Sequence, residues 1–345
     1  MIYQDDHITL HQAEALAGLR EIPDESVQCV VTSPPYWGLR DYRVKGQIGL
    51  EKTPEEYVAK LVDVFRQVRR VLKKDGTVWL NLGDSYCASG HGWSVAESKS
   101  GKYKSMELAG GYKGRDPVPG LKPKDLIGIP WRVALALQTD GWFLRSEVIW
   151  SKPNPMPESV TDRPTRAHEY IFLLTRRAKY FYNHEAIKEP VAPATVLRLD
   201  QDIENQKGST RANGGRKTNG PMKAVGKKPD KPGGHSRHHA GFNDRWDQMA
   251  KAEQSANGRN KRSVWEVATT GYPDAHFATF PPKLIEPCIL AGSRPGDTVL
   301  DPFWGSGTTG EVAVKHGRKA IGIELSPEYC KIYLKRFRQG VLKLI

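Results

Sequence analysis

The sequence has few cysteines and no long apolar run, and both absences narrow the kind of protein it encodes. Its four cysteines, Cys29, Cys87, Cys288 and Cys330, lie far apart and never form a C-x-x-C pair. This spacing excludes a zinc knuckle and a disulfide framework, and isolated cysteines of this kind usually behave as small buried hydrophobic residues. No segment approaches the roughly 20 apolar residues that a membrane span needs, so we expect no membrane partner.

Negative charge is also scarce. The chain of 345 residues has 52 Lys or Arg against 39 Asp or Glu, a formal net charge of +13, and its pI is about 9.4. This balance favours a polyanionic partner, and nucleic acid is the commonest one. The opening segment, MIYQDDHITL, carries two acids where a secretory leader would carry basic residues before an apolar stretch. We therefore expect a cytoplasmic protein.

Short apolar runs alternate with amphipathic segments at both ends of the chain, a pattern that predicts a doubly wound α/β fold. Hydrophobic residues make up 38% of the chain, enough for a substantial core. Thr53 and Pro54 predict the start of a helix that runs to residue 72. The expected strands are 7–12, 27–33, 77–83, 143–151, 170–175, 298–303 and 319–325, and the other expected helices are 124–139, 280–290, 308–316 and 327–338.

The stretch 195–262 differs in composition from the rest of the chain. It contains fifteen Lys or Arg against seven Asp or Glu, a net charge of +8, together with nine glycines. Its low apolar content leaves open a solvated linker or, as the favoured interpretation, a DNA-engaging loop that contacts phosphates. The histidines at 235, 238 and 239 lack a cysteine partner, so we expect no metal site. The DNA contacts expected in this stretch are Arg211, Arg216, Lys217, Lys227 and Lys228.

A glycine-rich loop follows one of the predicted strands. Gly305, Gly307 and Gly310 satisfy G-x-G-x-x-G between a strand and a helix, where glycines allow close approach of the backbone to a ligand. Glu324 ends the next predicted strand, where an acid can bind ribose hydroxyls, so a cofactor that contains a nucleoside is predicted. Asp301 precedes the turn and suits a cationic amino-acid group better than a pyrophosphate, which favours S-adenosylmethionine over NAD.

A second motif, T-S-P-P-Y at 32–36, also follows an apolar strand. Pro34 and Pro35 fix the backbone and remove two donors, so the nearby carbonyl groups remain as acceptors. The amino group of a base is a donor that needs such acceptors, and Tyr36 offers a flat face for a base swung out of the duplex. The motif therefore indicates an enzyme that acts on the amino group of a base.

V-T-S-P-P-Y together with D-P-F-W-G-S-G-T-T resembles the amino-methylating DNA methyltransferases, in the permuted order called the beta class. The resemblance implies a Rossmann-like methyltransferase fold with a mostly parallel, seven-stranded sheet. Residues 1–190 would form its catalytic half, 191–262 a basic target-recognition insertion and 263–345 its cofactor-binding half. S-adenosylmethionine is the implied cofactor and double-stranded DNA the implied substrate. A homodimer and a cognate restriction endonuclease are compatible partners.

Residue by residue, the resemblance implies that the Ser33 hydroxyl and the Pro34 carbonyl accept hydrogen bonds from the target amino group. The loops at Ser33 and Gly305 would then meet in one cleft. Relatives usually carry Gly-Asp where this chain has Ala13-Glu14, so Glu14 or Gln12 would bind the adenine of the cofactor. The implied catalytic residues are Ser33, Pro34, Pro35 and Tyr36; the implied cofactor-binding residues are Glu14, Thr279, Phe280, Asp301, Phe303, Gly305, Ser306, Gly307, Thr308 and Glu324; Trp37, Arg40 and Lys152 are further implied DNA contacts.

Ser33 bears on the target base, because T-S-P-P-Y is typical of cytosine-N4 enzymes, whereas adenine-N6 enzymes more often carry Asp or Asn there. Cytosine N4 is the favoured target and adenine N6 the alternative. Cys288 follows a proline but falls in an expected helix, which disfavours C5 methylation through a cysteine nucleophile. A dehydrogenase would leave T-S-P-P-Y unexplained, and a DNA-binding protein without catalysis would not need both motifs. Asp84 in N-L-G-D-S-Y is expected either to face the catalytic site or to cap a turn.

Overall fold

The computed structural model describes residues 1–39, 41–42, 44–87, 120–191, 194, 258–269 and 280–341. The chain divides into two compact units, one of Met1–Ile187 with Arg262–Ile345 and one of Lys188–Lys261. In the second unit, Glu189 and Arg259 pair through an isolated bridge and an ion pair of 3.3 Å. Of the residues singled out above, Arg40, Arg211, Arg216, Lys217, Lys227, Lys228, His235, His238, His239 and Thr279 lie outside the described residues.

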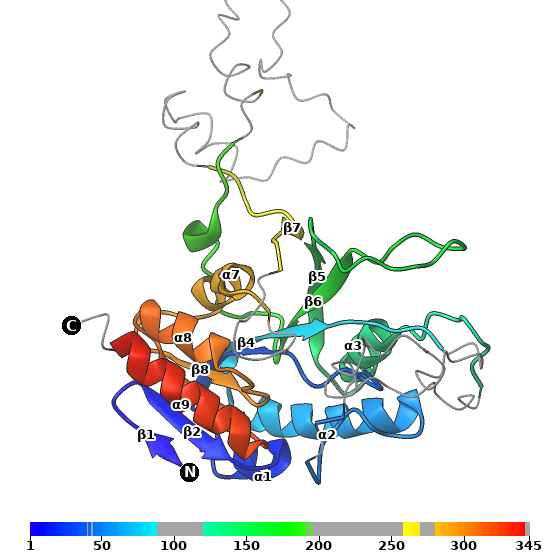
Figure 1. Cartoon of the computed structure of the whole chain (residues 1–345). Helices are drawn as coiled ribbons and strands as arrows, with labels where there is room; N and C mark the ends of the chain where they lie inside the picture. The colour runs from blue at the N-terminus through cyan, green and yellow to red at the C-terminus, as the bar shows by residue number, and fades with distance from the viewer. Residues whose placement is uncertain are drawn as a thin grey trace, which may run out of the picture. The chain divides into compact units, whose positions relative to one another are not determined.

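Within the described residues, nine strands of the first unit form one sheet (Figure 1). All seven predicted strands are present, and two short edge strands extend the sheet. Parallel pairing joins five neighbours at its centre, whereas β6 runs antiparallel to both of its neighbours. The order is β1 (Tyr3–Gln4), β2 (Ile8–Gln12), β9 (Lys319–Glu324), β8 (Thr298–Asp301), β3 (Val27–Thr32), β4 (Leu72–Leu82), β6 (His168–Thr175), β5 (Phe143–Ser151) and β7 (Val264–Glu266).

Helices cover both faces of this sheet (Figure 1). Successive side chains of a strand point to opposite faces, so Val30 of β3 belongs to one core cluster and Val31 to the other. No helix among the described residues has the length and apolar character to cross a membrane. One face packs against α1 (Ala15–Arg20), α2 (Pro54–Val71) and α3 (Ile129–Thr139), and the other against α7 (Pro282–Gly292), α8 (Thr308–Lys315) and α9 (Pro327–Val341).

The helix α2 follows the sequence signals closely. The Thr53 hydroxyl accepts a hydrogen bond from the Glu56 amide at 3.2 Å, and Pro54 occupies the first turn, where its missing N–H has no cost. Glu55 and Glu56 place negative charge at the positive end of the helix dipole. Tyr57 and Phe65 lie on the face that packs against the sheet, and both are fully buried. The helix therefore begins where its cap was predicted.

Two predicted boundaries differ from the structure by more than three residues. The helix α3 begins at Ile129 and not at residue 124, because Gly128 adopts a positive φ of 77° and Pro130 stands in the first turn. The strand β4 begins at Leu72 and not at Thr77, although residues 73–76 carry three charges. This early segment pairs with β3 across an irregularity between Val27 and Cys29. Both ends of β4 are set by backbone pairing with its neighbouring strands, and the local pattern of apolar residues carries no information about that pairing.

Candidate active site

The two motifs meet where the chain leaves two neighbouring parallel strands in opposite directions. After β3 it continues into α2 on one face of the sheet, and after β8 into α8 on the other. Loops that diverge in this way open a crevice at the carboxyl ends of the strands. Both loops line one cavity, as expected. From the predicted site, its lining contains Glu14, Ser33, Pro34, Pro35, Tyr36, Phe280, Asp301, Phe303, Gly305, Ser306, Thr308 and Glu324.

Asp301 joins the two strand ends. One carboxylate oxygen accepts a hydrogen bond of 2.6 Å from the Thr32 hydroxyl and one of 3.0 Å from the Phe303 amide. The other accepts a bond of 2.8 Å from the Thr309 hydroxyl at the start of α8. Only 2% of the residue is exposed, and this burial raises the pKa of the carboxyl to about 6 despite the three donors. Thr32, the first residue of T-S-P-P-Y, is thereby bonded to Asp301, which precedes the glycine-rich loop.

Glu324 lies at the end of β9 and orders the glycine-rich loop. Its two carboxylate oxygens accept hydrogen bonds of 2.7 Å from the Gly305 amide and of 2.7 Å from the Ser326 amide. Burial raises the pKa of this carboxyl, although the backbone donors oppose the effect. Because the Gly305 amide is used by a carboxylate, it does not point freely toward a phosphate, as the amides of a phosphate-binding loop do.

The charged side chains in the cavity wall are all acids. Among its described lining residues, three carry a carboxylate, namely Glu14, Asp301 and Glu324, and none is Lys or Arg. Asp301 and Glu324 are buried and Glu14 is exposed; carboxylates at these positions attract a cation and repel a pyrophosphate. Phe280 and Phe303 add aromatic surface. These residues fit S-adenosylmethionine, whose amino-acid end carries an ammonium and a sulfonium, and they do not fit NAD.

The three glycines of the G-x-G-x-x-G loop serve different purposes. Gly305 lines the cavity, whereas Gly307 does not. A Cβ at Gly307, where φ is 82°, would lie 2.1 Å from the ring of Tyr333, and one at Gly310 would lie 2.2 Å from the ring of Trp304. The expected contact of Gly307 with the cofactor stays a prediction, and the described lining of the cavity does not include this residue. The glycines after Gly305 make room for two buried aromatic rings that pack edge to face at 5.1 Å.

A hydrogen bond from α2 anchors the T-S-P-P-Y loop. The Tyr57 hydroxyl donates a hydrogen bond of 2.9 Å to the Pro35 carbonyl. Within the described part of the chain, the Pro34 carbonyl accepts no hydrogen bond. Ser33 is partly exposed and lines the cavity. The loop therefore presents the Ser33 hydroxyl and the Pro34 carbonyl as neutral acceptors beside the acidic pocket.

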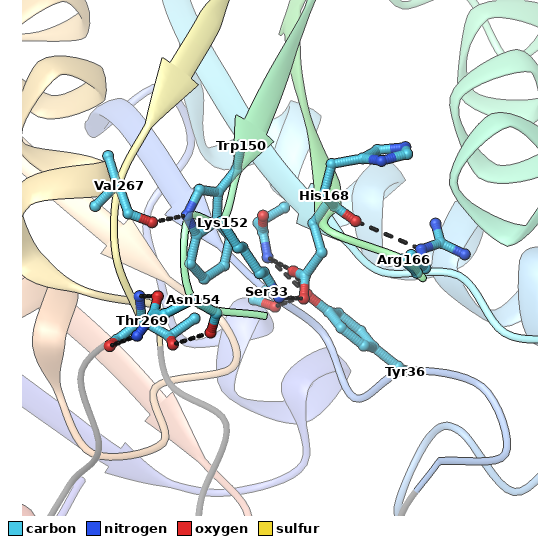
Figure 2. Close-up of polar contacts among 11 residues, drawn as sticks. Ser33, Tyr36, Trp150, Lys152, Asn154, Arg166, His168, Val267 and Thr269 are labelled. Atoms are coloured by element: carbon cyan, nitrogen blue, oxygen red, sulfur yellow. Dashed lines mark hydrogen bonds and ion pairs between the residues drawn. The ribbon is translucent and has the colours of Figure 1, made fainter. Parts of the chain in front are cut away.

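The hydroxyl of Tyr36 points into a polar cluster and not into solvent (Figure 2). It lies 2.6 Å from Oε2 of Glu169 and 2.6 Å from Nδ2 of Asn81. Glu169 also forms a close ion pair with Lys152, whose ammonium lies 4.3 Å from the ring centroid of Trp150. Desolvation and the neighbouring Glu169 raise the pKa of Tyr36 well above its ordinary value, so the phenol stays protonated.

Sequence reasoning missed Asn81 and Glu169. Asn81 is the single polar residue in the run V-W-L-N-L of β4, and Glu169 precedes the apolar run Y-I-F-L-L of β6. An isolated polar residue in a buried strand was the available signal, because such a group needs a partner. Their partner Tyr36 is distant in sequence, and antiparallel pairing of β4 with β6 brings the two strands together.

Two further candidates have other surroundings than expected, and a third has one of its two expected roles. Trp37 is 1% exposed and its indole donates a hydrogen bond of 3.0 Å to the Glu51 carbonyl, so a contact with DNA is not supported. Lys152 directs its charge toward Glu169. Asp84 accepts hydrogen bonds from the amides of Gly128 and Ile129 at 2.9 and 3.0 Å, which makes it a cap of α3 and answers the question left open above. In the described ranges no cluster of acids, cysteines or histidines is arranged for a metal ion.

Comparison with known proteins agrees with this geometry. A model of the DNA methylase family N6_N4_Mtase matches residues 27–335. The chain is 45% identical over 324 residues to the Type II methyltransferase M.SmaI of Serratia marcescens, covering 94% of this chain and 87% of that protein. It is 43% identical over 330 residues to the Type II methyltransferase M.Cfr9I of Citrobacter freundii, covering 96% and 87%.

Solved structures show the same fold at lower identity. The PvuII DNA methyltransferase (cytosine-N4-specific) superposes with a TM-score of 0.58 at 18% identity, covering 97% of this chain and 88% of that one. A Thermus thermophilus chain named as a DNA modification methylase, complexed with S-adenosyl-L-methionine, gives 0.53 at 22% identity, covering 97% and 96%. The chain therefore belongs to the DNA methylase family N6_N4_Mtase and is an S-adenosylmethionine-dependent DNA methyltransferase.

Proposed function

We propose that the protein methylates the exocyclic N4 nitrogen of cytosine at specific sites in double-stranded DNA. One observation supports this most directly. Ser33 and Pro34, which offer two neutral acceptors, line the same cavity as Asp301 and Glu324. The family resemblance links a neutral hydroxyl at position 33 to cytosine N4, with adenine N6 as the alternative. Within the permuted beta-class order, the T-S-P-P-Y loop comes first and the cofactor loop last.

The arrangement suits direct transfer without a covalent enzyme intermediate. S-adenosylmethionine, when bound, supplies an electrophilic methyl group. Asp301 would attract its cationic end and Glu324 would accept hydrogen bonds from its ribose hydroxyls, with Glu14, Phe280 and Phe303 along the rest of the pocket. Ser33 and Pro34 would accept hydrogen bonds from the two amino hydrogens of a base turned out of the duplex, and Tyr36 would stack on that base. The nitrogen lone pair would form the new bond as the carbon–sulfur bond breaks and leaves a thioether, and the methylated amine would then lose one proton to water. The main gain comes from holding the nitrogen in line with the methyl carbon.

Methylation of a ring carbon lacks the nucleophile it would need. All four cysteines are buried, and none of them lines the described part of the cavity. Cys288 is fully buried within α7, and its sulfur lies 3.9 Å from the Leu284 carbonyl. A buried thiol in apolar surroundings is not an activated nucleophile. Transfer to an amino nitrogen needs no such group.

Identification of the methylated nucleoside tests the proposal. The protein is incubated with tritiated S-adenosylmethionine and, in parallel, with duplex or single-stranded DNA of mixed sequence, and the DNA is digested to nucleosides. The expected labelled product is N4-methylcytosine. N6-methyladenine would overturn the assigned base, and label only in single-stranded DNA would overturn the assigned substrate. A chain with Asp301→Asn serves as the control for label that does not depend on the pocket.

The similarity to Type II methyltransferases supports a role beside a restriction endonuclease with the same target. The basic stretch 191–262 is the part that we propose engages the duplex, because it carries most of the net charge of the chain. A homodimer and a cytoplasmic location stay predictions from the sequence. Deleting residues 208–260 is expected to abolish binding to DNA and to leave cofactor binding unchanged; DNA binding that survives the deletion would contradict this role.

A further inference from the structure

The cluster around Tyr36 contains a carboxylate to which neither motif assigns a role. Glu169 is the second residue of β6, and its Oε2 lies 2.6 Å from the Tyr36 hydroxyl and 3.0 Å from Nδ2 of Asn81. Its Oε1 faces the ammonium of Lys152. The side chain of Glu169 is only 15% exposed. A carboxylate so enclosed needs these three donors, and it sits directly behind the residue expected to stack on the base.

The chemistry of the partners fixes the direction of each hydrogen bond. An ionised carboxylate only accepts, so Tyr36 donates its hydroxyl hydrogen to Glu169. The amide nitrogen of Asn81 donates to the Tyr36 oxygen at 2.6 Å and to Glu169 at 3.0 Å, which also settles the orientation of that amide. Oε1 of the same carboxylate pairs with the ammonium of Lys152. Tyr36 is therefore a donor toward Glu169 and an acceptor on its other side.

That direction extends to Ser33. The Ser33 hydroxyl lies 3.4 Å from the Tyr36 oxygen and donates toward it. At this distance the bond is weak, but it orients the hydrogen away from the cavity that Ser33 lines. The lone pairs of the Ser33 oxygen are then left to accept from a donor such as a base amine.

The ring of Tyr36 is fixed as well as its hydroxyl. A Cβ at Gly83 would lie 2.5 Å from Cε2 of Tyr36, so the ring packs directly against the backbone at the end of β4. The hydroxyl, next to that edge of the ring, is held by Asn81 and Glu169. These contacts restrain the ring along one edge and at its hydroxyl, and they come from residues outside the T-S-P-P-Y motif.

We propose that Glu169 is a positioning residue for methyl transfer. It holds Tyr36 in the orientation for stacking and, through Tyr36, turns the acceptor side of Ser33 toward the target amine. This rests on the proposed function only in that an amino group is methylated, and it applies equally to cytosine N4 and adenine N6. It also assigns Lys152 to Glu169 as a charge partner, in place of the direct DNA contact expected from the sequence.

A double-mutant cycle tests the proposal. Glu169→Gln keeps the shape of the side chain and should lower kcat for total methyl incorporation into duplex DNA by roughly 10- to 100-fold, the cost of a misplaced reacting group. The dissociation constant of S-adenosylmethionine should stay unchanged. Tyr36→Phe removes the hydroxyl through which Glu169 acts, so Glu169→Gln should add less than about threefold in the Tyr36→Phe background. Multiplying losses, or an unchanged kcat in Glu169→Gln, would overturn the proposal.

A matched control and a second readout separate this from loss of the fold. Glu55→Gln makes the same chemical change in an exposed ion pair with Arg132, of 2.8 Å, on α2 and should leave kcat unchanged. In protein labelled with ¹³Cζ-tyrosine, the Tyr36 signal is the one that Tyr36→Phe removes. Glu169→Gln should shift it, and an unshifted signal would contradict the contact. If the wild-type protein methylates no DNA, the proposed function fails, while this signal still decides the role of Glu169.

Discussion

The two loops that meet in the cavity hold their polar groups in opposite ways. On the cofactor side, Asp301 and Glu324 are charged acceptors whose oxygens are already bonded to hydroxyls and backbone amides. On the target side, Ser33 and the Pro34 carbonyl are neutral acceptors that stay open. A cation is attracted by fixed charge, which needs no free lone pair, whereas an amine is oriented by free lone pairs. One loop therefore needs buried acids, and the other needs proline and a hydroxyl.

The largest expected effect comes from removing charge on the cofactor side. Asp301→Asn should weaken the binding of S-adenosylmethionine by about 100-fold, because contacts with a charged group are worth up to ~3 kcal/mol. The amide can still accept from Thr32, so the junction of β3 and β8 should persist. Isothermal titration calorimetry measures the affinity. Asp297→Asn, which changes an acid just before the other end of β8, is the control and should bind normally; equal affinity in both variants would refute the role of Asp301.

Removing an acceptor on the target side should have a smaller effect of a different kind. Ser33→Ala is expected to lower kcat by about 10- to 50-fold, since a lost hydrogen bond to a reacting group costs roughly 1.5–2.5 kcal/mol. The affinity for S-adenosylmethionine should not change, because Asp301 and Glu324 remain. Steady-state methylation of DNA together with calorimetry separates the two effects. Ser26→Ala, an exposed serine just before β3, is the matched control; a loss of cofactor affinity in Ser33→Ala would break the contrast between the loops.

Lowering the pH should weaken the binding of the cofactor, because it protonates Asp301. Burial raises the pKa of Asp301 to about 6 from an ordinary 3.8, so this acid is mostly neutral at pH 5. The affinity for the cation should fall by about tenfold between pH 7.5 and pH 5. The raised pKa has the opposite effect on stability. The folded protein binds the proton of Asp301 more tightly than the unfolded chain does, so the free energy of unfolding falls as pH rises from about 4 to 6.

Calorimetry across this pH range checks the effect on binding. Asp301→Asn should flatten the curve, although burial also raises the pKa of Glu324 and leaves a residual slope. A wild-type affinity that is independent of pH would show that Asp301 does not contact the cationic end of the cofactor.

Substituting the glycines that make room for aromatic rings should change the affinity for the cofactor least, and its main effect should be on the stability of the fold. Gly310→Ala should destabilise the fold by about 1–3 kcal/mol through the clash with Trp304, and Gly307→Ala by more, because its φ is also positive. Gly296→Ala has a similar φ of 84° and open space around it, so it isolates the conformational cost. Urea unfolding measures all three. Normal stability in Gly310→Ala would show that the ring of Trp304 moves aside without cost.

Much of this fold could be predicted because its signals are local. The strand β5 lies at the predicted residues, and Thr53 caps α2 as expected. The loops at Ser33 and Gly305 share a cavity because each follows a strand of the same parallel sheet. Motif, cap and apolar run each reside in a few consecutive residues, and the topology of a doubly wound sheet then brings the loops together.

The parts that could not be predicted depend on packing between distant segments. Gly307 fits the motif for a cofactor contact, but its position is set by the ring of Tyr333 from α9. Trp37 looked available beside the catalytic loop, yet it is buried in the core. Glu169 and Asn81 acquire their role only when β4 and β6 pair behind Tyr36. No spacing rule in the sequence links these residues.

The central claim is that one cavity holds the cofactor against the T-S-P-P-Y loop. A crystal structure with S-adenosylhomocysteine bound tests it most directly. The account predicts that the amino-acid end lies near Asp301, the ribose near Glu324, and the sulfur on the side of the pocket that faces Ser33. Cofactor bound outside this cavity, or inside it with the adenine next to Ser33, would contradict the account.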